Sequence, residues 1–95
     1  MFIVQLKFSD NRDRASQFME GHKAWINLGF DDGVFLLVGG LQPNLGGGII
    51  ADNCSLAALQ SRVHSDPLVA EGIVTAEIIE IEPARADRRL EFLLG

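Results

Sequence analysis

Residues 2–29 read FIVQLKFSDNRDRASQFMEGHKAWINLG, and the spacing of their apolar residues changes partway along. From Phe2 to Phe8 the apolar residues alternate along the chain, which predicts a strand with one strongly apolar face. From Ala15 to Gly29 they recur every three or four positions, which predicts an amphipathic helix of about five turns. We expect the short polar residues before this helix to cap it and Gly29 to end it.

The remaining sequence continues the alternation of strand and helix patterns. The elements predicted there are an all-apolar strand (Val34–Val38), a glycine-rich hairpin connection (Gly39–Gly48), a short strand (Ile49–Ala51), a helix that opens at Ser55 and stops before Pro67, a short turn (Pro67–Glu71) and a last strand (Ile73–Glu82). The β-α-β-β-α-β order is typical of α+β proteins with a ferredoxin-like sandwich, whose helices cover one face of the sheet. We expect the two helices to run in roughly the same direction.

Composition and charge restrict the possible classes of function. The chain has 95 residues, enough for one domain, with a net charge of −5 and a single cysteine. An acidic chain of this kind has no electrostatic footprint for nucleic acid. Its longest apolar run, Val34–Val38, is far shorter than the roughly 20 residues of a membrane span. We therefore expect a cytoplasmic domain with no nucleic-acid or membrane partner.

The predicted sheet is apolar on both faces, because the strand at 34–38 shows no alternation and the last strand has apolar residues on both sides. Two helices can cover only one of these faces. We expect the other face to be buried against a second copy, in a homodimer or a higher oligomer. Alternatively, a C-terminal tail, residues 84–95, folds over the sheet with Phe92 and Leu93. We assign residues 1–83 to the folded domain and expect the tail to pack on the dimer.

Two residues could carry acid–base chemistry. His22 lies on the apolar stripe of the first predicted helix, and imidazole is the side chain best suited to proton transfer near neutral pH. A histidine that merely fills the core would have the same spacing. Asp66, just beyond the second helix, could orient the imidazole, although aspartate before proline is also a good helix N-cap. The expected helix directions place both residues near one edge of the sheet.

Other polar features are weaker candidates. The glycines between Gly39 and Gly48 precede a strand and lack the Gly-Lys-Ser/Thr signature, so a hairpin or a lid is favoured over a phosphate loop. His64 has no second histidine one helical turn away, and we predict no metal site. Cys54 adjoins a predicted helix start, which would lower the pKa of its thiol.

Several of these residues occur together at defined spacings. His22 is followed eleven positions later by Gly33, a predicted strand ends at Gly39, a helix opens at Ser55, and the segment Asp66-Pro67-Leu68-Val69-Ala70-Glu71-Gly72-Ile73 follows. From Phe2 to about Pro83 the chain resembles the YciI-like (YCII-related) proteins. The resemblance implies a dimeric α+β barrel with His22 and Asp66 as the active-site pair. The chain departs from the family pattern at Gly40, where proline is common, and in the short connection that follows, so no substrate is transferred.

The resemblance and the residue pattern together favour an isomerase-like or lyase-like enzyme that needs no cofactor. His22 would act as general base or acid on a small cyclic or enolisable substrate, with Asp66 fixing its tautomer. The residues expected to contact the substrate are Phe18, Trp25, Phe35 and Gly39. The alternative is a non-catalytic dimeric module that binds a small hydrophobic ligand. The two hypotheses differ in whether His22 opens to a cavity.

Overall fold

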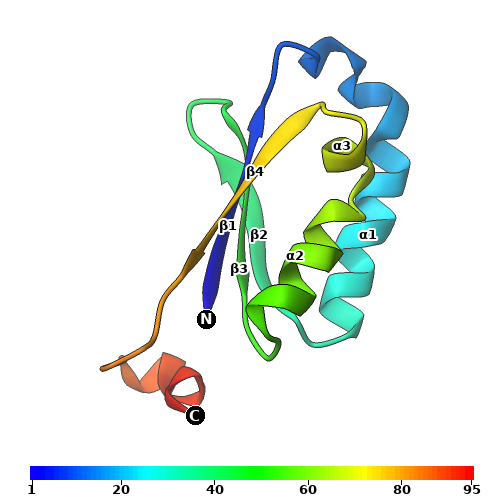
Figure 1. The fold of residues 1–95 in the computed structure, drawn as a ribbon. Helices are drawn as coiled ribbons and strands as arrows, with labels where there is room; N and C mark the ends of the chain where they lie inside the picture. The colour runs from blue at the N-terminus through cyan, green and yellow to red at the C-terminus, as the bar shows by residue number, and fades with distance from the viewer.

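The structure, a computed structural model of residues 1–95, is an α+β fold with one antiparallel sheet and its α-helices on one face (Figure 1). Its elements are β1 (Phe2–Phe8), the 3₁₀ helix η1 (Arg12–Phe18), α1 (Met19–Asp31), β2 (Phe35–Leu41), β3 (Gly46–Ala51), α2 (Leu56–His64), α3 (Pro67–Ala70), β4 (Val74–Glu80) and the 3₁₀ helix η2 (Arg88–Leu94). The strand order is β2-β3-β1-β4, with every neighbouring pair antiparallel. This arrangement is compatible with the predicted ferredoxin-like fold.

The two longer helices, α1 and α2, run in opposite directions, so the predicted common direction is wrong. β1 and β2 are both antiparallel to β3, so the helix after β1 and the helix after β3 cross the sheet in opposite senses. The contacts between the helices follow the same order. His22 meets Asp66, whereas Trp25, one turn later in α1, bonds to Arg62, one turn earlier in the chain. Figure 1 shows α1 descending beside the sheet and α2 rising beside it.

The first predicted helix is divided into two elements. Its N-terminal half is the 3₁₀ helix η1, and only Met19–Asp31 is α-helical. The predicted cap is absent, because Asn11 makes no side-chain bond to the start of η1. Ser9 and Asn11 donate instead to the carbonyl oxygen of Gly72. His22 consequently lies in the first turn of α1 rather than in the later half of a longer helix.

Gly29 lies inside α1 and does not end it. The helix continues to Asp31, and the left-handed residue after it is Gly33, with a φ of +73°. Gly29 is buried against Phe35, and a Cβ atom added at Gly29 would overlap the Phe35 ring. The glycine therefore allows α1 to approach β2 closely, because any side chain would occupy the space of the ring.

Most of the predicted hairpin connection is strand. β2 extends to Leu41 and β3 begins at Gly46, so only residues 42–45 connect them. The glycines of the two strands pair with one another, Gly39 with Gly48 and Gly40 with Gly47. Because ladder hydrogen bonds join backbone groups, these residues pair as sheet despite a composition that is typical of loops.

The core lies between the sheet and the helices. Alternate residues of β1 are buried there, as the period of two predicts, and they pack with Leu59 and Val63 of α2. Ser55 caps α2 as predicted, since its Oγ accepts the backbone N–H of Ala58 at 3.1 Å. The sequence pattern therefore predicts the helix-facing side of the sheet correctly.

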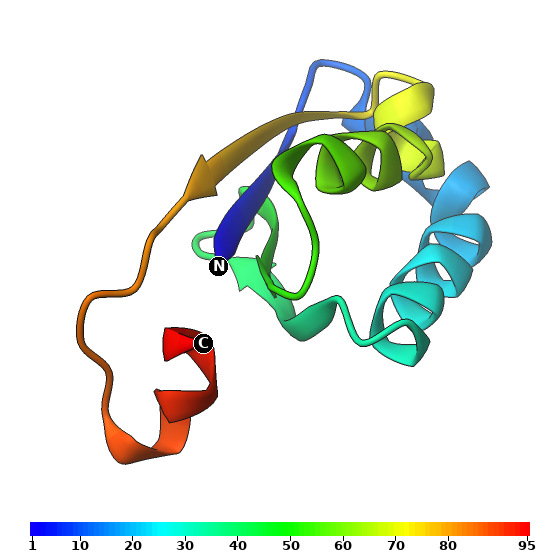
Figure 2. The same ribbon diagram turned by 60° about the horizontal axis from the view of Figure 1, so that its bottom comes forward.

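None of the helices α1, α2 and α3 covers the other face of the sheet, here called the open face (Figures 1 and 2). One apolar row crosses all four strands there, because Leu37, Ile50, Ile3 and Ile79 lie opposite one another in neighbouring strands. An irregularity in β2 next to Leu37 also leaves Leu36 exposed. In the single chain Leu37 is 54% exposed and Ile79 is 40% exposed. Within the single chain, the strand predicted to be buried on both sides has Phe35 buried on its helix side, whereas Leu36 and Leu37 remain exposed beside the C-terminal tail.

The C-terminal tail lies on the same side as the open face (Figure 2). A space of about 270 Å³ is lined by residues of the tail and of the sheet, namely Leu90, Phe92, Leu93, Met1, Leu36, Leu37 and Ile50. Leu90 and Phe92 remain exposed beside it. Ile79 does not line this space, so the tail reaches one part of the apolar row and leaves another part uncovered.

Candidate functional site

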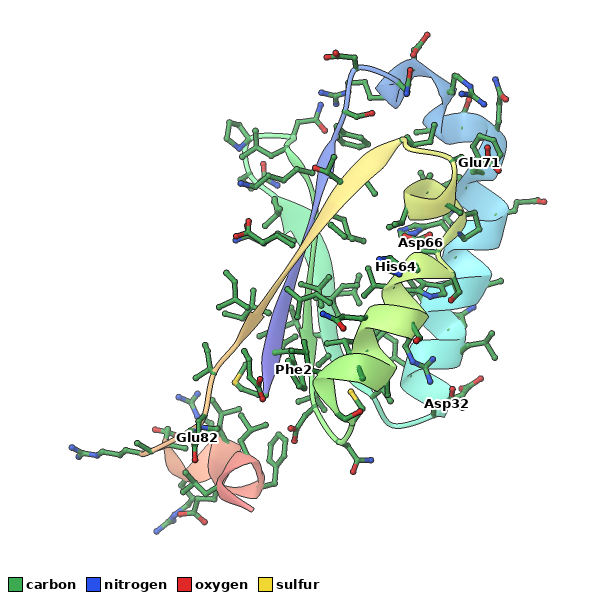
Figure 3. The ribbon with its side chains drawn as sticks, in the orientation of Figure 1. Phe2, Asp32, His64, Asp66, Glu71 and Glu82 are labelled. Carbon is green, nitrogen blue, oxygen red and sulfur yellow. The ribbon has the colours of Figure 1, made fainter.

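His22 and Asp66 are in direct contact. Nδ1 of His22 lies 2.8 Å from Oδ1 of Asp66, although 44 positions separate the residues in the chain. Asp66 lies where α2 ends and α3 begins, beside α1 (Figure 3). The contact arises because the first turn of α1 lies against the end of the antiparallel α2. The two side chains thus meet, through helix directions opposite to those expected from the sequence.

Asp66 is completely buried and makes its hydrogen bonds through one oxygen. Oδ1 accepts the backbone N–H of Leu68 at 3.1 Å, which is the predicted N-cap bond of α3, and it also contacts the imidazole. Oδ2 is buried without a hydrogen-bond partner. His22 is the one ionisable side chain bonded to this carboxylate. A buried carboxylate needs hydrogen-bond donors, and the imidazole and the Leu68 N–H are the two that contact this one.

The second ring nitrogen of His22 is accessible. Nε2 makes no hydrogen bond within the protein, and Oδ2 of Asp66 is the sole buried side-chain nitrogen or oxygen without a partner. Nε2 is therefore not buried, although the His22 side chain as a whole is only 15% exposed. Trp25 stacks on the imidazole with ring centroids 5.7 Å apart, and its own N–H is fixed by the carbonyl oxygen of Arg62. The ring is thus held at one nitrogen and packed along one side.

His22 lines a cavity of about 180 Å³ between the sheet and the helices. The residues around it are Leu6, Phe8, Met19, His22, Gly46, Gly47, Leu68 and Val74. His22 is the one ionisable side chain among them, and five of the eight residues are hydrophobic. Since a cavity of about 150 Å³ holds a benzene-sized molecule, this one accommodates a small ring compound beside the imidazole.

The four residues predicted to contact the substrate do not line this cavity. Trp25 and Phe35 are buried with ring centroids 5.0 Å apart in edge-to-face contact, and Trp25 reaches the site through its stacking on His22. Phe18 ends η1 and packs against the core. Gly39 faces the open face, because its register partners are Gly48 and, across β3, Gln5.

Several lining residues were missed from the sequence, and two of them carried a usable signal. Met19 precedes His22 by three positions and so shares its helix face. Leu68 follows the Asp66 cap in the short helix α3. Gly47 carried no such signal, because its position beside the cavity depends on pairing with Leu6 in β1.

A loop-to-loop contact fixes the far end of α3. The Ser9 hydroxyl donates to the carbonyl oxygen of Gly72 at 2.6 Å, and the amide of Asn11 donates to the same oxygen at 3.3 Å. At its other end α3 is capped by Asp66. The helix that carries Leu68 into the cavity is therefore held at both ends.

Other candidate features lie away from His22. His64 lines a separate cavity of about 250 Å³ with residues of α2 and β4. No group of three or more histidine, cysteine, aspartate or glutamate side chains is close enough to hold a metal ion. None of the helices combines the length and apolar content needed to cross a membrane.

The predicted lowering of the Cys54 pKa is wrong. Burial raises the pKa of this thiol above its usual range and outweighs the opposing effect of the Arg62 guanidinium. Because the thiolate is the nucleophile, we expect iodoacetamide to alkylate Cys54 more slowly in the native protein than in the urea-unfolded protein at the same pH. Mass spectrometry of timed samples measures both rates, and a faster native reaction would contradict the expectation.

No family profile matches the chain, and no curated protein is significantly similar to it.

Proposed function

We propose that the protein is a small enzyme that uses His22 and Asp66 for general acid–base chemistry on a small cyclic or enolisable substrate. The observation that carries the proposal is the asymmetry of the imidazole: Nδ1 contacts Asp66 at 2.8 Å, while Nε2 is unbonded and accessible in a residue that lines a cavity. The resemblance to YciI-like proteins supports the same pair of residues.

The proposed proton transfer follows from the two ring nitrogens. With the imidazole neutral, Nδ1–H donates to Asp66, which leaves the lone pair of Nε2 free to accept a proton from a substrate C–H or O–H group. The imidazolium that forms is stabilised by the buried carboxylate. Return of the proton to another substrate atom completes an isomerisation, whereas departure of a leaving group completes an elimination. Neither reaction requires a cofactor.

A non-catalytic module that binds a small hydrophobic ligand is the second candidate. The apolar lining of the cavity favours binding of such a ligand whether or not a reaction follows. Binding of a hydrophobic ligand does not, however, require a buried carboxylate that contacts the imidazole. The two candidates therefore differ in the effect expected when His22 or Asp66 is replaced.

We also propose that two copies of the chain pack their open faces together, as in a dimeric α+β barrel. The apolar row on four strands supports this assembly, because its exposed isoleucine and leucine side chains would leave water. A two-fold axis would place the same row on both sides of the interface. The His22 cavities would then lie on the two outer, helix-covered layers.

The role of Asp66 in fixing the imidazole can be tested by NMR. At alkaline pH, where imidazole is neutral, the ring nitrogen shifts of His22 should report hydrogen on Nδ1 in the native protein. Asp66→Ala should abolish this preference and reduce stability by about 1–3 kcal/mol, since the N–H of Leu68 loses its acceptor.

The matched control is Asp66→Asn, which retains an acceptor oxygen for Leu68 and for Nδ1–H. We expect it to keep the Nδ1–H tautomer and nearly native thermal stability. An unchanged tautomer in Asp66→Ala would show that other contacts orient the ring and would count against the proposed pair.

A further inference from the structure

On the sheet side of the cavity, two of the lining residues, Gly46 and Gly47, are glycines and have no side chain. Gly47 pairs with Leu6 in β1, and Leu6 is buried toward the helices. Residues opposite each other in an antiparallel pair share one face of the sheet, so the side-chain position of Gly47 also faces the helices. Gly47 accordingly lines the cavity beside His22.

The backbone at Gly47 does not itself require glycine. Its φ lies outside the left-handed range, and an added Cβ would meet only the carbonyl oxygen of Gly39, at an ordinary 3.7 Å. The neighbouring Gly46 differs, since it has a φ of +139° and an added Cβ there would overlap the Leu6 carbonyl. Glycine also weakens a strand relative to residues with side chains. The absence of a side chain at Gly47 therefore leaves space in the cavity and is not required by the backbone conformation.

We propose that Gly47 sets the depth of the His22 cavity, and that the cavity takes an uncharged compound the size of phenol, whose hydroxyl reaches Nε2. This inference rests on the proposed function and adds a size-determining residue and a ligand class to it. Any larger residue at position 47 would direct its side chain into the space of about 180 Å³ that the ligand occupies.

The charge preference follows from the groups around the cavity. No lysine or arginine lines it. The positive charge of a protonated His22 is already compensated by Asp66 at 2.8 Å. An anionic ligand would lose its hydration without meeting a lysine or arginine in the cavity lining, whereas a neutral ring with one hydroxyl can pack against the apolar walls and bond to the accessible nitrogen.

The test compares phenol with benzoate, which has the same ring but a negative charge at neutral pH. NMR titration of the native protein should show saturable shifts at Gly47 and at the His22 ring with phenol, and at least tenfold weaker binding of benzoate. Gly47→Val should weaken phenol binding at least tenfold without lowering the melting temperature. Gly47→Ala, a smaller change, should give an intermediate loss.

The matched control is Gly39→Val, which makes the same substitution on the neighbouring strand. Gly39 faces the open face and an added Cβ meets no atom within 4 Å, so phenol binding should remain native. Absence of phenol binding to the native protein, preference for benzoate, or native phenol affinity in both Gly47 variants would overturn the inference. The tautomer of His22 tests the proposed pair independently, because Gly47 makes no hydrogen bond to either residue.

Discussion

His22→Gln is expected to lower the rate of base-catalysed opening of 5-nitrobenzisoxazole by about 10²- to 10⁴-fold. This uncharged probe loses one C–H proton to a base, its N–O bond breaks, and the ring oxygen leaves as a coloured phenolate that absorbance detects. In the native protein Nε2 of His22 would take that proton from a probe whose reacting C–H edge enters the cavity. Glutamine has similar length but no basic nitrogen, so the variant retains the shape of the site and loses the base.

Two further variants separate the origins of the effect. His64→Gln removes the other histidine, which lines a different cavity, and should leave the rate unchanged. Asp66→Asn retains the hydrogen-bond acceptor but removes the charge that stabilises the imidazolium, so its rate should fall while the His22 tautomer is kept. A native rate in His22→Gln would remove the proposed acid–base function and leave the ligand-binding module as the better explanation.

Local patterns in the sequence predict several parts of this fold because the determining interactions are local. The strand from Phe2 to Phe8 follows from alternation, and the caps at Ser55 and Asp66 follow from side chains that bond to backbone two or three positions away. Helix ends that depend on packing were predicted less well. Gly29 has the residue type of a helix end, but its close contact with Phe35 of β2 determines its role.

The site could be predicted only in part for the same reason. His22 and Asp66 were identified by residue type and resemblance, yet the helix directions used to bring them together were reversed. Their contact depends on strand order and on the position where 3₁₀ geometry gives way to α1, and both are tertiary properties. The cavity wall at Gly47 requires the register of β1 against β3, which the glycine-rich sequence did not reveal.

Ile79→Lys is expected to convert a dimer into a monomer. The proposed open-face interface would bury Ile79 at the β4 end of the apolar row, and a lysine there would bring an unpaired charge into that contact. Sedimentation should give about twice the chain mass of 10.4 kDa for the native protein and about 10.4 kDa for the variant at micromolar concentration. A native mass of one chain would exclude the proposed dimer under those conditions.

The control for this change is the next residue in the chain, Glu80, which lies on the opposite face of β4. Glu80 pairs with Phe2, whose side chain is buried toward the helices, so Glu80→Lys introduces the same lysine on the opposite face of β4 and should leave the mass of the dimer unchanged.

Deletion of residues 84–95 tests whether a second copy of the chain or the C-terminal tail covers the apolar row. Because Ile79 lies outside the space that the tail lines, the truncated protein should remain dimeric. A truncated protein that becomes monomeric would instead assign the decisive contacts to Leu90, Phe92 and Leu93, and the apolar row would then need the tail to complete its interface.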